Sequence, residues 1–419
     1  MKVLIGIVLA AGKGKRLCPL TETRPKILLP ILGQPVIYRH IDLLKKLGID
    51  KVVVVVSHFR EKVVEVVKDI ANDIGVEVDF VDQKEELGTG HAVKVVLRKY
   101  EDDAVISYGD IYIQHTKLLP SLIDVVRRKD NYIVGVEVGD ISRYGKLIVD
   151  GDRVLGVIEK PSEGGRGLIN AGIYVVKGSV LKLVEEIGLS PRREYELTDL
   201  ISIANEKGYT FKFIKIESEW WQDIGYPWDF LKSVKLELSD IRSRVIKGEI
   251  DHSVTIKGAV VVDEGAVVKG STYIEGPVYI GKDTVIGPNS YLRPYTSIER
   301  GSHIGFSVEV KESIVLEKSH AAHLTYIGDS IIGENVNLGA GTLIANLRFD
   351  EKTVKVSIDG IRIDTGRRKM GAIIGGYVRT GVNVSIMPGV KIGSYSIIYP
   401  GVTVYRDIPP NAIVDRDWI

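Results

Sequence analysis

The chain has 419 residues, too many for one hydrophobic core, so we expect two or three domains. Its 56 basic and 55 acidic residues nearly cancel, which argues against bulk attraction to nucleic acid or to a membrane surface. The single cysteine, Cys18, excludes a disulfide framework and a cysteine-based metal cluster. No stretch approaches the roughly 20 apolar residues of a membrane span. We therefore expect a cytoplasmic protein that binds neither nucleic acid nor membranes, and its many Val, Ile, Lys and Glu residues and few glutamines are typical of a thermophile.

The N-terminal segment predicts a phosphate-binding loop. The apolar run from Val3 to Leu9 is typical of a buried parallel strand, and a glycine-rich stretch follows it. Glycine exposes backbone N–H groups to an anion, and Arg16 and Lys26 add positive charge. The spacing is neither the dinucleotide fingerprint GxGxxG nor the P-loop GxxxxGK[ST]. The candidate nucleotide-binding residues of this loop are Leu9, Ala10, Ala11, Gly12 and Gly14.

From residue 1 to about 230, short aliphatic runs alternate with amphipathic stretches. Residues 52–56 and 104–107 are predicted strands, whereas 38–47 and 61–74, each followed by glycine, are predicted helices. This alternation predicts a doubly wound α/β sheet that binds its ligand at the carboxyl ends of the strands.

After about Ile250 the period of the sequence changes. Aliphatic residues now recur about every six positions with Gly, Asn or Ser between them. This hexapeptide period predicts a parallel β-helix whose stacked coils share one core. A charged insertion over 346–369 interrupts the repeat, and we interpret it as an excursion loop, a feature that often carries function. The predicted domains are 1–230, a linker helix over 231–249, the β-helix over 250–407 and a C-terminal tail over 408–419.

Three N-terminal motifs follow one another in the chain: LAAGKGKRL at 9–17, PLT at 19–21 and PKILLPI at 25–31. Together they resemble the signature of sugar-1-phosphate nucleotidylyltransferases. The resemblance implies attack by a sugar-1-phosphate oxygen on the α-phosphorus of a nucleoside triphosphate, with release of pyrophosphate. Arg16 and Lys26 are the implied catalytic residues, acting on the departing pyrophosphate and on the α-phosphate. Positioning and charge neutralisation supply most of such catalysis.

Two further segments resemble the base-recognition and metal motifs of this family. Gln83 and the glycine segment at Gly88 and Thr89 are implied to contact a pyrimidine, although by themselves Gln83 is typical of a solvated loop and Gly88 of a helix N-cap. Asp110, at the end of a predicted strand, and Asp223 are the implied ligands of Mg²⁺, which prefers carboxylates together with phosphates. The WxDxG pattern around Asp223 resembles thymidylyl-type members, whereas uridylyl-type bifunctional enzymes usually carry Asn, so UTP and dTTP both remain open.

The sugar-phosphate motifs of the family also occur in order. Glu159 is implied to hold sugar hydroxyls, Lys160 the phosphate of the sugar, and Asn170 an acyl or hydroxyl group. The implied sugar-phosphate residues are Gly145, Glu159, Lys160 and Asn170.

The β-helix carries HLTYIGD at 323–329, NLGAGT at 337–342 and then Asn346. These segments resemble the acetyltransferase half of the bifunctional glucosamine-1-phosphate N-acetyltransferase/N-acetylglucosamine-1-phosphate uridylyltransferases. The resemblance implies a left-handed helix, a homotrimer and His323 as the general base for the sugar ammonium, a role that suits an imidazole because it titrates near neutral pH. The implied sugar-phosphate contacts of this site are Arg293, Lys311, Tyr326, Asn337 and Asn346, and the implied acetyl-CoA contacts are Ala340, Pro400 and Arg416. Leu347 departs from the family, which has tyrosine there.

Over the whole chain the resemblance predicts an archaeal-type bifunctional enzyme that uses acetyl-CoA, UTP or dTTP, and Mg²⁺. Its fold is an α/β doubly wound, Rossmann-like nucleotidyltransferase domain followed by a left-handed parallel β-helix. It acetylates glucosamine-1-phosphate and transfers a nucleotidyl group to N-acetylglucosamine-1-phosphate. One alternative is a UDP- or dTDP-glucose pyrophosphorylase with a scaffold β-helix, against which His323 and Tyr326 argue. A catalytically dead subunit is another, against which Arg16 and Asp110 argue. Because each site is expected in its own domain, the residues before Ile250 are expected to keep nucleotidyl transfer alone.

Overall fold

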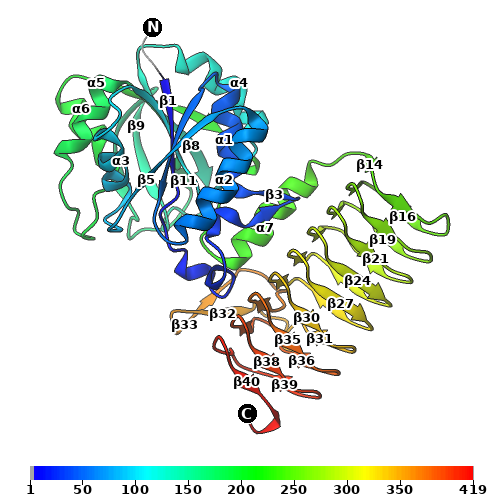
Figure 1. Ribbon diagram of the computed structural model, residues 1–419. Helices are drawn as coiled ribbons and strands as arrows, with labels where there is room; N and C mark the ends of the chain where they lie inside the picture. The colour runs from blue at the N-terminus through cyan, green and yellow to red at the C-terminus, as the bar shows by residue number, and fades with distance from the viewer. Residues whose placement is uncertain (1–3, 419) are drawn as a thin grey trace. The chain divides into compact units, whose positions relative to one another are not determined.

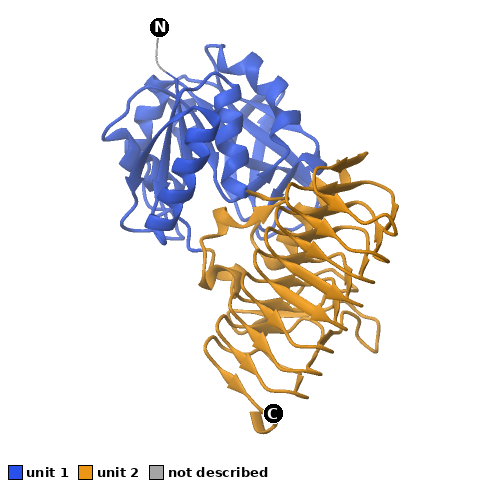
Figure 2. Ribbon diagram, turned by 45° about the vertical axis from the view of Figure 1, so that its right-hand side comes forward, with its two compact units in different colours: residues 1–13, 35–223 blue, residues 14–34, 224–419 orange. Residues whose placement is uncertain are grey.

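The computed structural model describes residues 4–418, and the chain forms two compact units that are each discontinuous in sequence (Figure 2). The first unit contains the chain up to Lys13 together with Pro35–Asp223, and the second contains Gly14–Gln34 and the chain from Ile224 onward. The prediction assigned residues 1–230 to one domain, whereas Gly14–Gln34 belongs to the second unit. Within residues 4–418 no helix is long and apolar enough to cross a membrane.

The first unit is built on a nine-stranded mixed sheet in the order β5-β4-β1-β6-β11-β8-β12-β10-β9 (Figure 1). The strands β5, β4, β1 and β6 pair in parallel, whereas β11 runs antiparallel to β6 and to β8. The predicted α/β class is confirmed. The parallel, doubly wound part of the sheet consists of β5, β4, β1 and β6, the strands of this sheet that come first in the sequence. The strands are β1 (Leu4–Leu9), β4 (Lys51–Val56), β5 (Glu77–Asp82), β6 (Asp103–Tyr108), β8 (Asn131–Val138), β9 (Gly145–Asp150), β10 (Arg153–Glu159), β11 (Gly167–Val176) and β12 (Phe211–Ile216).

The helices of this unit form where apolar residues recur with helical spacing. In the helix that spans Arg60–Ile74, Val63, Val67 and Ile70 are buried, and Gly75 ends it in the left-handed conformation with φ of 74°. The helices predicted over 38–47 and 61–74 are confirmed within two residues. Val3, the first residue of the predicted strand, lies outside the described residues. The helices are α1 (Val36–Lys46), α2 (Arg60–Ile74), α3 (Thr89–Leu97), α4 (His115–Val126), α5 (Gly178–Leu181) and α6 (Asp199–Glu206).

The second unit contains helix α7 (Pro227–Ser239) and a left-handed parallel β-helix of three sheets (Figure 1). In most coils one aliphatic side chain of each sheet points inside, aligned with its equivalent in the next coil; in the second sheet Thr380 is an exception. One such internal file, with every member at most 4% exposed, is Ile274, Leu292, Val310, Ile327, Ile344, Ile386 and Val404.

The strands of the β-helix are two to four residues long. The first sheet comprises β14 (Arg244–Ile246), β17 (Val260–Val262), β20 (Val278–Ile280), β23 (Thr296–Ile298), β26 (Ile314–Val315), β29 (Ile331–Ile332), β34 (Ile373–Ile374) and β37 (Lys391–Ile392). The second comprises β15 (Glu249–Ile250), β18 (Val267–Val268), β21 (Val285–Ile286), β24 (His303–Phe306), β27 (His320–His323), β30 (Asn337–Leu338), β35 (Arg379–Thr380), β38 (Ile397–Ile398) and β40 (Ile413–Val414). The third comprises β16 (Thr255–Lys257), β19 (Tyr273–Glu275), β22 (Tyr291–Leu292), β25 (Glu309–Lys311), β28 (Tyr326–Gly328), β31 (Leu343–Ile344), β36 (Ser385–Ile386) and β39 (Thr403–Val404).

The ends of the β-helix and its insertion differ from the sequence-based boundaries. Helix α7 ends at Ser239 and β14 already pairs with β17, so no helix fills 240–249. At the other end, β40 pairs with β38, so the predicted tail contributes to a further coil. The charged insertion is an ordered antiparallel hairpin of β32 (Lys355–Ile358) and β33 (Ile361–Asp364), after which β34 resumes the stack on β29.

The segment Gly14–Gln34, which we call the docking segment, lies against turns that follow strands of the first β-helix sheet. Arg24 donates two hydrogen bonds to the Glu317 carboxylate, at 3.1 and 2.8 Å, and its Nη2 also lies 3.3 Å from Glu334 Oε2. The N–H of Gly33 donates to Glu299 Oε2 at 2.9 Å. The three carboxylates that follow successive strands β23, β26 and β29 form the acidic file of Glu299, Glu317 and Glu334.

Burial raises the pKa of Glu299 from 4.5 to about 8, and the Glu317 carboxylate adds to the rise. The favourable contribution of the protonated Glu299 is complete below pH 4.5 and is lost as the pH rises through 8. We therefore expect Glu299→Gln, which cannot ionise, to gain thermal stability relative to the wild type on going from pH 6 to pH 9. Thermal unfolding at both pH values measures this difference, and the same substitution at exposed Glu264 is the control. A wild-type-minus-variant difference that is the same at both pH values would contradict the expectation.

Candidate active sites

A cavity of about 260 Å³ opens at the carboxyl ends of β1, β5 and β6, the edge where a parallel sheet binds ligands. It lies wholly in the first unit. The lining includes predicted residues. It also includes side chains that were not predicted from the sequence, above all Tyr108 and two carboxylates. The lining residues are Leu9, Ala11, Gly12, Gln83, Glu86, Gly88, Thr89, Ala92, Tyr108, Asp110 and Glu194.

Gln83 is held rigidly in this cavity. It is only 4% exposed, and its Nε2 donates to the Gly88 carbonyl oxygen at 3.0 Å and lies 3.2 Å from His91 Nδ1. Gly88 is the N-cap of α3 with φ of 99°, and an added Cβ there would lie 2.6 Å from the Tyr195 carbonyl oxygen. The solvated-loop alternative for Gln83 is therefore wrong, whereas the N-cap alternative for Gly88 is confirmed alongside its place in the cavity wall.

Of the two predicted metal ligands, Asp223 ends strand β13 (Trp221–Asp223) and Asp110 immediately precedes the neighbouring strand β7 (Ile111–Ile113). The two strands pair antiparallel, and Asp223 stands opposite Ile111, the residue after Asp110. Arg143 Nη2 contacts Asp223 Oδ2 at 3.4 Å. Within residues 4–418 no group of three or more His, Cys, Asp or Glu side chains could hold a metal. A pair of carboxylates nevertheless fits Mg²⁺, which usually keeps several waters and shares substrate phosphates.

The predicted sugar-phosphate residues lie on β9, on β10 with the residue that follows it, and on β11. Glu159 Oε1 accepts a hydrogen bond from Thr198 Oγ1 at 2.8 Å, and an added Cβ on Gly145 would lie 2.9 Å from that same oxygen. Gly145 therefore leaves the space that the Glu159 carboxylate occupies. Lys160 follows β10 with φ of 44°.

Asn170 belongs to a hydrogen-bonded chain that reaches the cavity. Its Nδ2 donates to Tyr174 Oη at 2.6 Å, and Tyr174 Oη lies 3.2 Å from Tyr108 Oη. Burial raises the pKa of Tyr108 to about 12, so its phenol stays protonated at neutral pH. The signal for Tyr108 was present in the sequence, because it directly precedes the Gly109-Asp110 motif.

The two predicted catalytic cations belong to the second unit. The Arg16 guanidinium lies 5.0 Å from the ring centre of Tyr226, which caps α7. Gly14 has φ of 65°, and an added Cβ there would lie 3.3 Å from the Lys26 side chain. Arg16 and Lys26 are thus both carried by the docking segment, an assignment that the sequence did not suggest.

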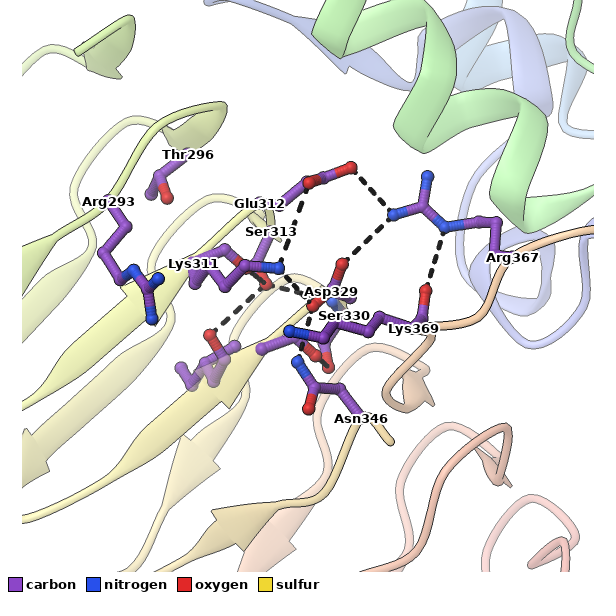
Figure 3. Close-up of polar contacts among 12 residues, drawn as sticks. Arg293, Thr296, Lys311, Glu312, Ser313, Asp329, Ser330, Asn346, Arg367 and Lys369 are labelled. Carbon is purple, nitrogen blue, oxygen red and sulfur yellow. Dashed lines mark hydrogen bonds and ion pairs between the residues drawn. The ribbon is translucent and has the colours of Figure 1, made fainter. Parts of the chain in front are cut away.

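In the β-helix, the buried carboxylate of Asp329 is surrounded by the side chains of Lys311, Asn346 and Arg367 (Figure 3). The side chain of Asp329 is 2% exposed, and its Oδ2 accepts hydrogen bonds from Lys311 Nζ at 2.8 Å and from Asn346 Nδ2 at 2.6 Å. Arg367, from the insertion, donates to Asp329 Oδ1 at 3.2 Å and to Glu312 Oε1 at 2.9 Å. Asp329 and Arg367 were not predicted from the sequence, because neither stands at a position with an implied role.

Tyr326 and Arg293 lie on the same sheet as Lys311. Tyr326 Oη accepts a hydrogen bond from Asn346 Nδ2 at 3.2 Å, and burial, reinforced by Glu309 and Asp329, raises the pKa of its phenol. Arg293 donates to Glu309 Oε1 at 2.9 Å. Three of the five predicted sugar-phosphate residues of the β-helix, Lys311, Tyr326 and Asn346, therefore belong to one hydrogen-bonded network. Arg293 is paired with Glu309, which stands opposite Tyr326, and Asn337 stands apart on β30.

His323 lies exposed at the end of β27 in the second sheet, opposite Phe306 of the preceding coil. When the register of β27, β30, β35, β38 and β40 is continued two or three residues beyond the ends of the strands, each later coil has a residue equivalent to His323. Hydrogen bonds from Gly341 N–H to the His323 carbonyl and from Gly401 N–H to the Val382 carbonyl agree with this continuation. The file that results is His323, Ala340, Val382, Pro400 and Arg416.

Comparison with known proteins divides the chain by sequence, so the first match includes Gly14–Gln34 and α7 of the second unit. The sequence matches the nucleotidyl transferase family over residues 5–239, the GMPPB C-terminal domain over 274–367 and six bacterial transferase hexapeptide repeats over 371–406. A crystal structure of a candidate glucose-1-phosphate thymidylyltransferase from Bacillus anthracis, in complex with a sucrose, covers 56% of this chain and 95% of its own with 25% identity and a TM-score of 0.50. The class is therefore a nucleotidyl transferase joined to a hexapeptide-repeat β-helix.

Full-length relatives narrow the class. A bifunctional sugar-1-phosphate nucleotidylyltransferase/acetyltransferase from Sulfurisphaera tokodaii is 47% identical, with 96% of this chain and 97% of the relative covered. A bifunctional protein GlmU from Methanocaldococcus jannaschii is 42% identical, with 97% and 96% covered. The chain belongs to this family of bifunctional sugar-1-phosphate nucleotidylyltransferases/acetyltransferases.

Proposed function

We propose that the chain catalyses two reactions: acetyl transfer from acetyl-CoA to glucosamine-1-phosphate, and nucleotidyl transfer from UTP or dTTP to N-acetylglucosamine-1-phosphate. The observation that carries the proposal is the network in which Asp329 holds Lys311 and Asn346 (Figure 3). Asn346 also donates a hydrogen bond to Tyr326. A β-helix that serves only as a scaffold needs no such network, since aliphatic files alone stabilise its coils. Family membership over nearly the whole chain supports the same two activities.

Nucleotidyl transfer requires the protein mainly to hold charges in place. The backbone of the glycine loop binds the triphosphate, Gln83 pairs with the pyrimidine, and Glu159 accepts hydrogen bonds from sugar hydroxyls. Arg16 and Lys26 neutralise charge on the pyrophosphate and the α-phosphate. Asp110 and Asp223 are the residues that would hold Mg²⁺, which supplies further neutralisation of the phosphates when bound.

Acetyl transfer requires a free amine. His323 takes a proton from the sugar ammonium, and the amine nitrogen then bonds to the thioester carbonyl carbon. The carbon–sulfur bond breaks, and the second proton lost by the nitrogen passes to the departing thiolate, which leaves as CoA. Arg293 and Lys311 bind the phosphate of the sugar, while Tyr326 and Asn337 orient its ring. The file of Ala340, Pro400 and Arg416 below His323 is placed along a single line of coils, as an extended cofactor such as acetyl-CoA requires.

Asp110→Asn should reduce pyrophosphate release from UTP and N-acetylglucosamine-1-phosphate to background, because an amide cannot replace the carboxylate as an anionic metal ligand. CoA release from acetyl-CoA and glucosamine-1-phosphate should stay at the wild-type rate, since Asp110 lies in the first unit. Both products are measured on the same preparation, with exposed Asp73→Asn as the matched control. Pyrophosphate release by Asp110→Asn at the wild-type rate, or full wild-type activity in excess chelator, would refute the metal assignment.

His323→Ala should lower CoA release by on the order of 10²–10⁴-fold, the usual contribution of a general base. Pyrophosphate release and melting temperature should hardly change, because the side chain is exposed. The exposed His252→Ala is the control. If the variant keeps wild-type CoA release, His323 is not the base; if the wild type releases pyrophosphate but no CoA, the pyrophosphorylase alternative replaces the proposal.

We also propose a homotrimer, supported by exposed apolar side chains on the second β-helix sheet, among them Ile397, Tyr399 and Ile413 at 42%, 50% and 59% exposure. Burial against identical surfaces in a closed ring would remove them from water. Sedimentation equilibrium should give three times the chain mass over a wide range of protein concentration. A monomer throughout that range would exclude the trimer.

A further inference from the structure

The docking segment touches a succession of β-helix coils along a single edge. Besides the contacts of Arg24 and Gly33 with the acidic file, the N–H of Ser394 donates to Glu22 Oε2 at 2.6 Å. Ser394 follows β37, two coils beyond Glu334. The segment therefore runs from the coil of β37, near Glu22, back to the coil of β23, near Gly33.

Small residues let the segment approach the backbone of the coils between these contacts. An added Cβ on Gly375 would lie 3.0 Å from the Pro19 side chain, and one on Gly376 would lie 3.1 Å from Thr23 Oγ1. Both glycines follow β34, which stands between β29 and β37 in the stack. The contact between the docking segment and the β-helix coils is thus close-packed as well as polar.

Arg24 is the centre of this contact. Its side chain is 9% exposed and that of Glu334 is 5% exposed, so two opposite charges are withdrawn from water together. Burial by itself would lower the pKa of Arg24, but the Glu317 and Glu334 carboxylates raise it above its ordinary value, and the guanidinium stays charged. A planar guanidinium held by two oxygens of one carboxylate fixes direction as well as distance.

The segment that this ion pair holds also carries the predicted triphosphate ligands. Arg24 precedes Lys26 by two residues, and Lys26 begins a 3₁₀ turn that ends at Leu28. On the other side, Thr21 Oγ1 donates to the Gly14 carbonyl oxygen at 2.9 Å, which ties the loop around Arg16 to the docked residues.

We propose that Arg24, through its ion pairs with Glu317 and Glu334, is a positioning residue for nucleotidyl transfer, because it anchors the segment carrying Arg16 and Lys26 to the β-helix. This inference rests on the proposed nucleotidyl transfer activity. The β-helix then has a role in that reaction besides its own acetyl transfer. The expectation that residues before Ile250 suffice for nucleotidyl transfer loses its basis, because a chain ending there would lack Glu299, Glu317 and Glu334.

The test uses the full chain and compares Arg24→Ala and Arg24→Lys with Arg300→Ala, which removes an exposed ion pair with Asp283 on the same β-helix. Arg24→Ala should lower kcat for pyrophosphate release by at least about tenfold and raise KM for the triphosphate, since displacing a positioned group by 1 Å can lower a rate on the order of 10²-fold. Arg24→Lys keeps the positive charge but not the planar guanidinium that binds two carboxylate oxygens. Its kcat for pyrophosphate release should therefore lie between those of Arg24→Ala and the wild type. CoA release should remain at the wild-type rate in all three variants.

Wild-type values of kcat and KM for pyrophosphate release in Arg24→Ala would overturn the inference. So would a loss of pyrophosphate and CoA release in equal proportion with a lowered melting temperature, since that pattern indicates general unfolding. If Arg24→Ala does not fold, Glu317→Gln takes its place: it leaves the Arg24–Glu334 pair intact and should show a smaller loss confined to pyrophosphate release. A wild type that releases no pyrophosphate contradicts the proposed function itself, whereas an active wild type with unaffected variants contradicts the role of Arg24 alone.

Discussion

Most of the second unit depends on one constraint: parallel strands of successive coils must stack at about 4.8 Å with the same register. Residues at equivalent positions therefore form files, and the chemical nature of each file decides what that side of the β-helix does. An aliphatic file such as that from Ile274 to Val404 makes the core. On the outside, the file from His323 to Arg416 runs along the proposed acetyl-CoA site, and the acidic file of Glu299, Glu317 and Glu334 receives the docking segment.

The same constraint explains what the sequence could and could not predict. Hexapeptide spacing is a local pattern, so the β-helix was predictable from it. Strand β14 was missed because all three of its residues are exposed, and the aliphatic signal of a buried file is therefore absent. The extra coil at β40 was not predicted, because the two prolines at 409 and 410 are typical of a chain that leaves regular structure.

The docking segment was unpredictable for a different reason. Arg24 and Glu317 are 293 residues apart, and no periodicity within either segment indicates that they meet. Resemblance to a family supplied candidate residues, but it assigned Arg16 and Lys26 to the α/β domain by their place in the sequence. In the same way, the two motifs that contain Tyr326 and Asn337 supplied candidates for the proposed acetyl site, but they gave no role to Asp329, which ends the first motif, or to Arg367, which lies outside both. Residues that orient others are defined by contacts in space, whereas motifs describe neighbours in sequence.

The choice of an ion pair to hold the docking segment has a physical logic. A purely apolar strip along the coil edge would present nearly equivalent surface at every coil, and a segment packed on it would be free to shift by one repeat. The Arg24 pairs with Glu317 and Glu334, taken together with the Gly33 contact to Glu299, admit one register, because a shift by one coil would take Glu299 from Gly33 and leave Glu334 desolvated and unpaired. Such pairs contribute less to net stability than to uniqueness of structure in the cases where that role is established. For a segment that carries the two cations proposed to bind phosphate, a single defined position matters more than tight packing, since catalysis by charge neutralisation depends on where the charges stand.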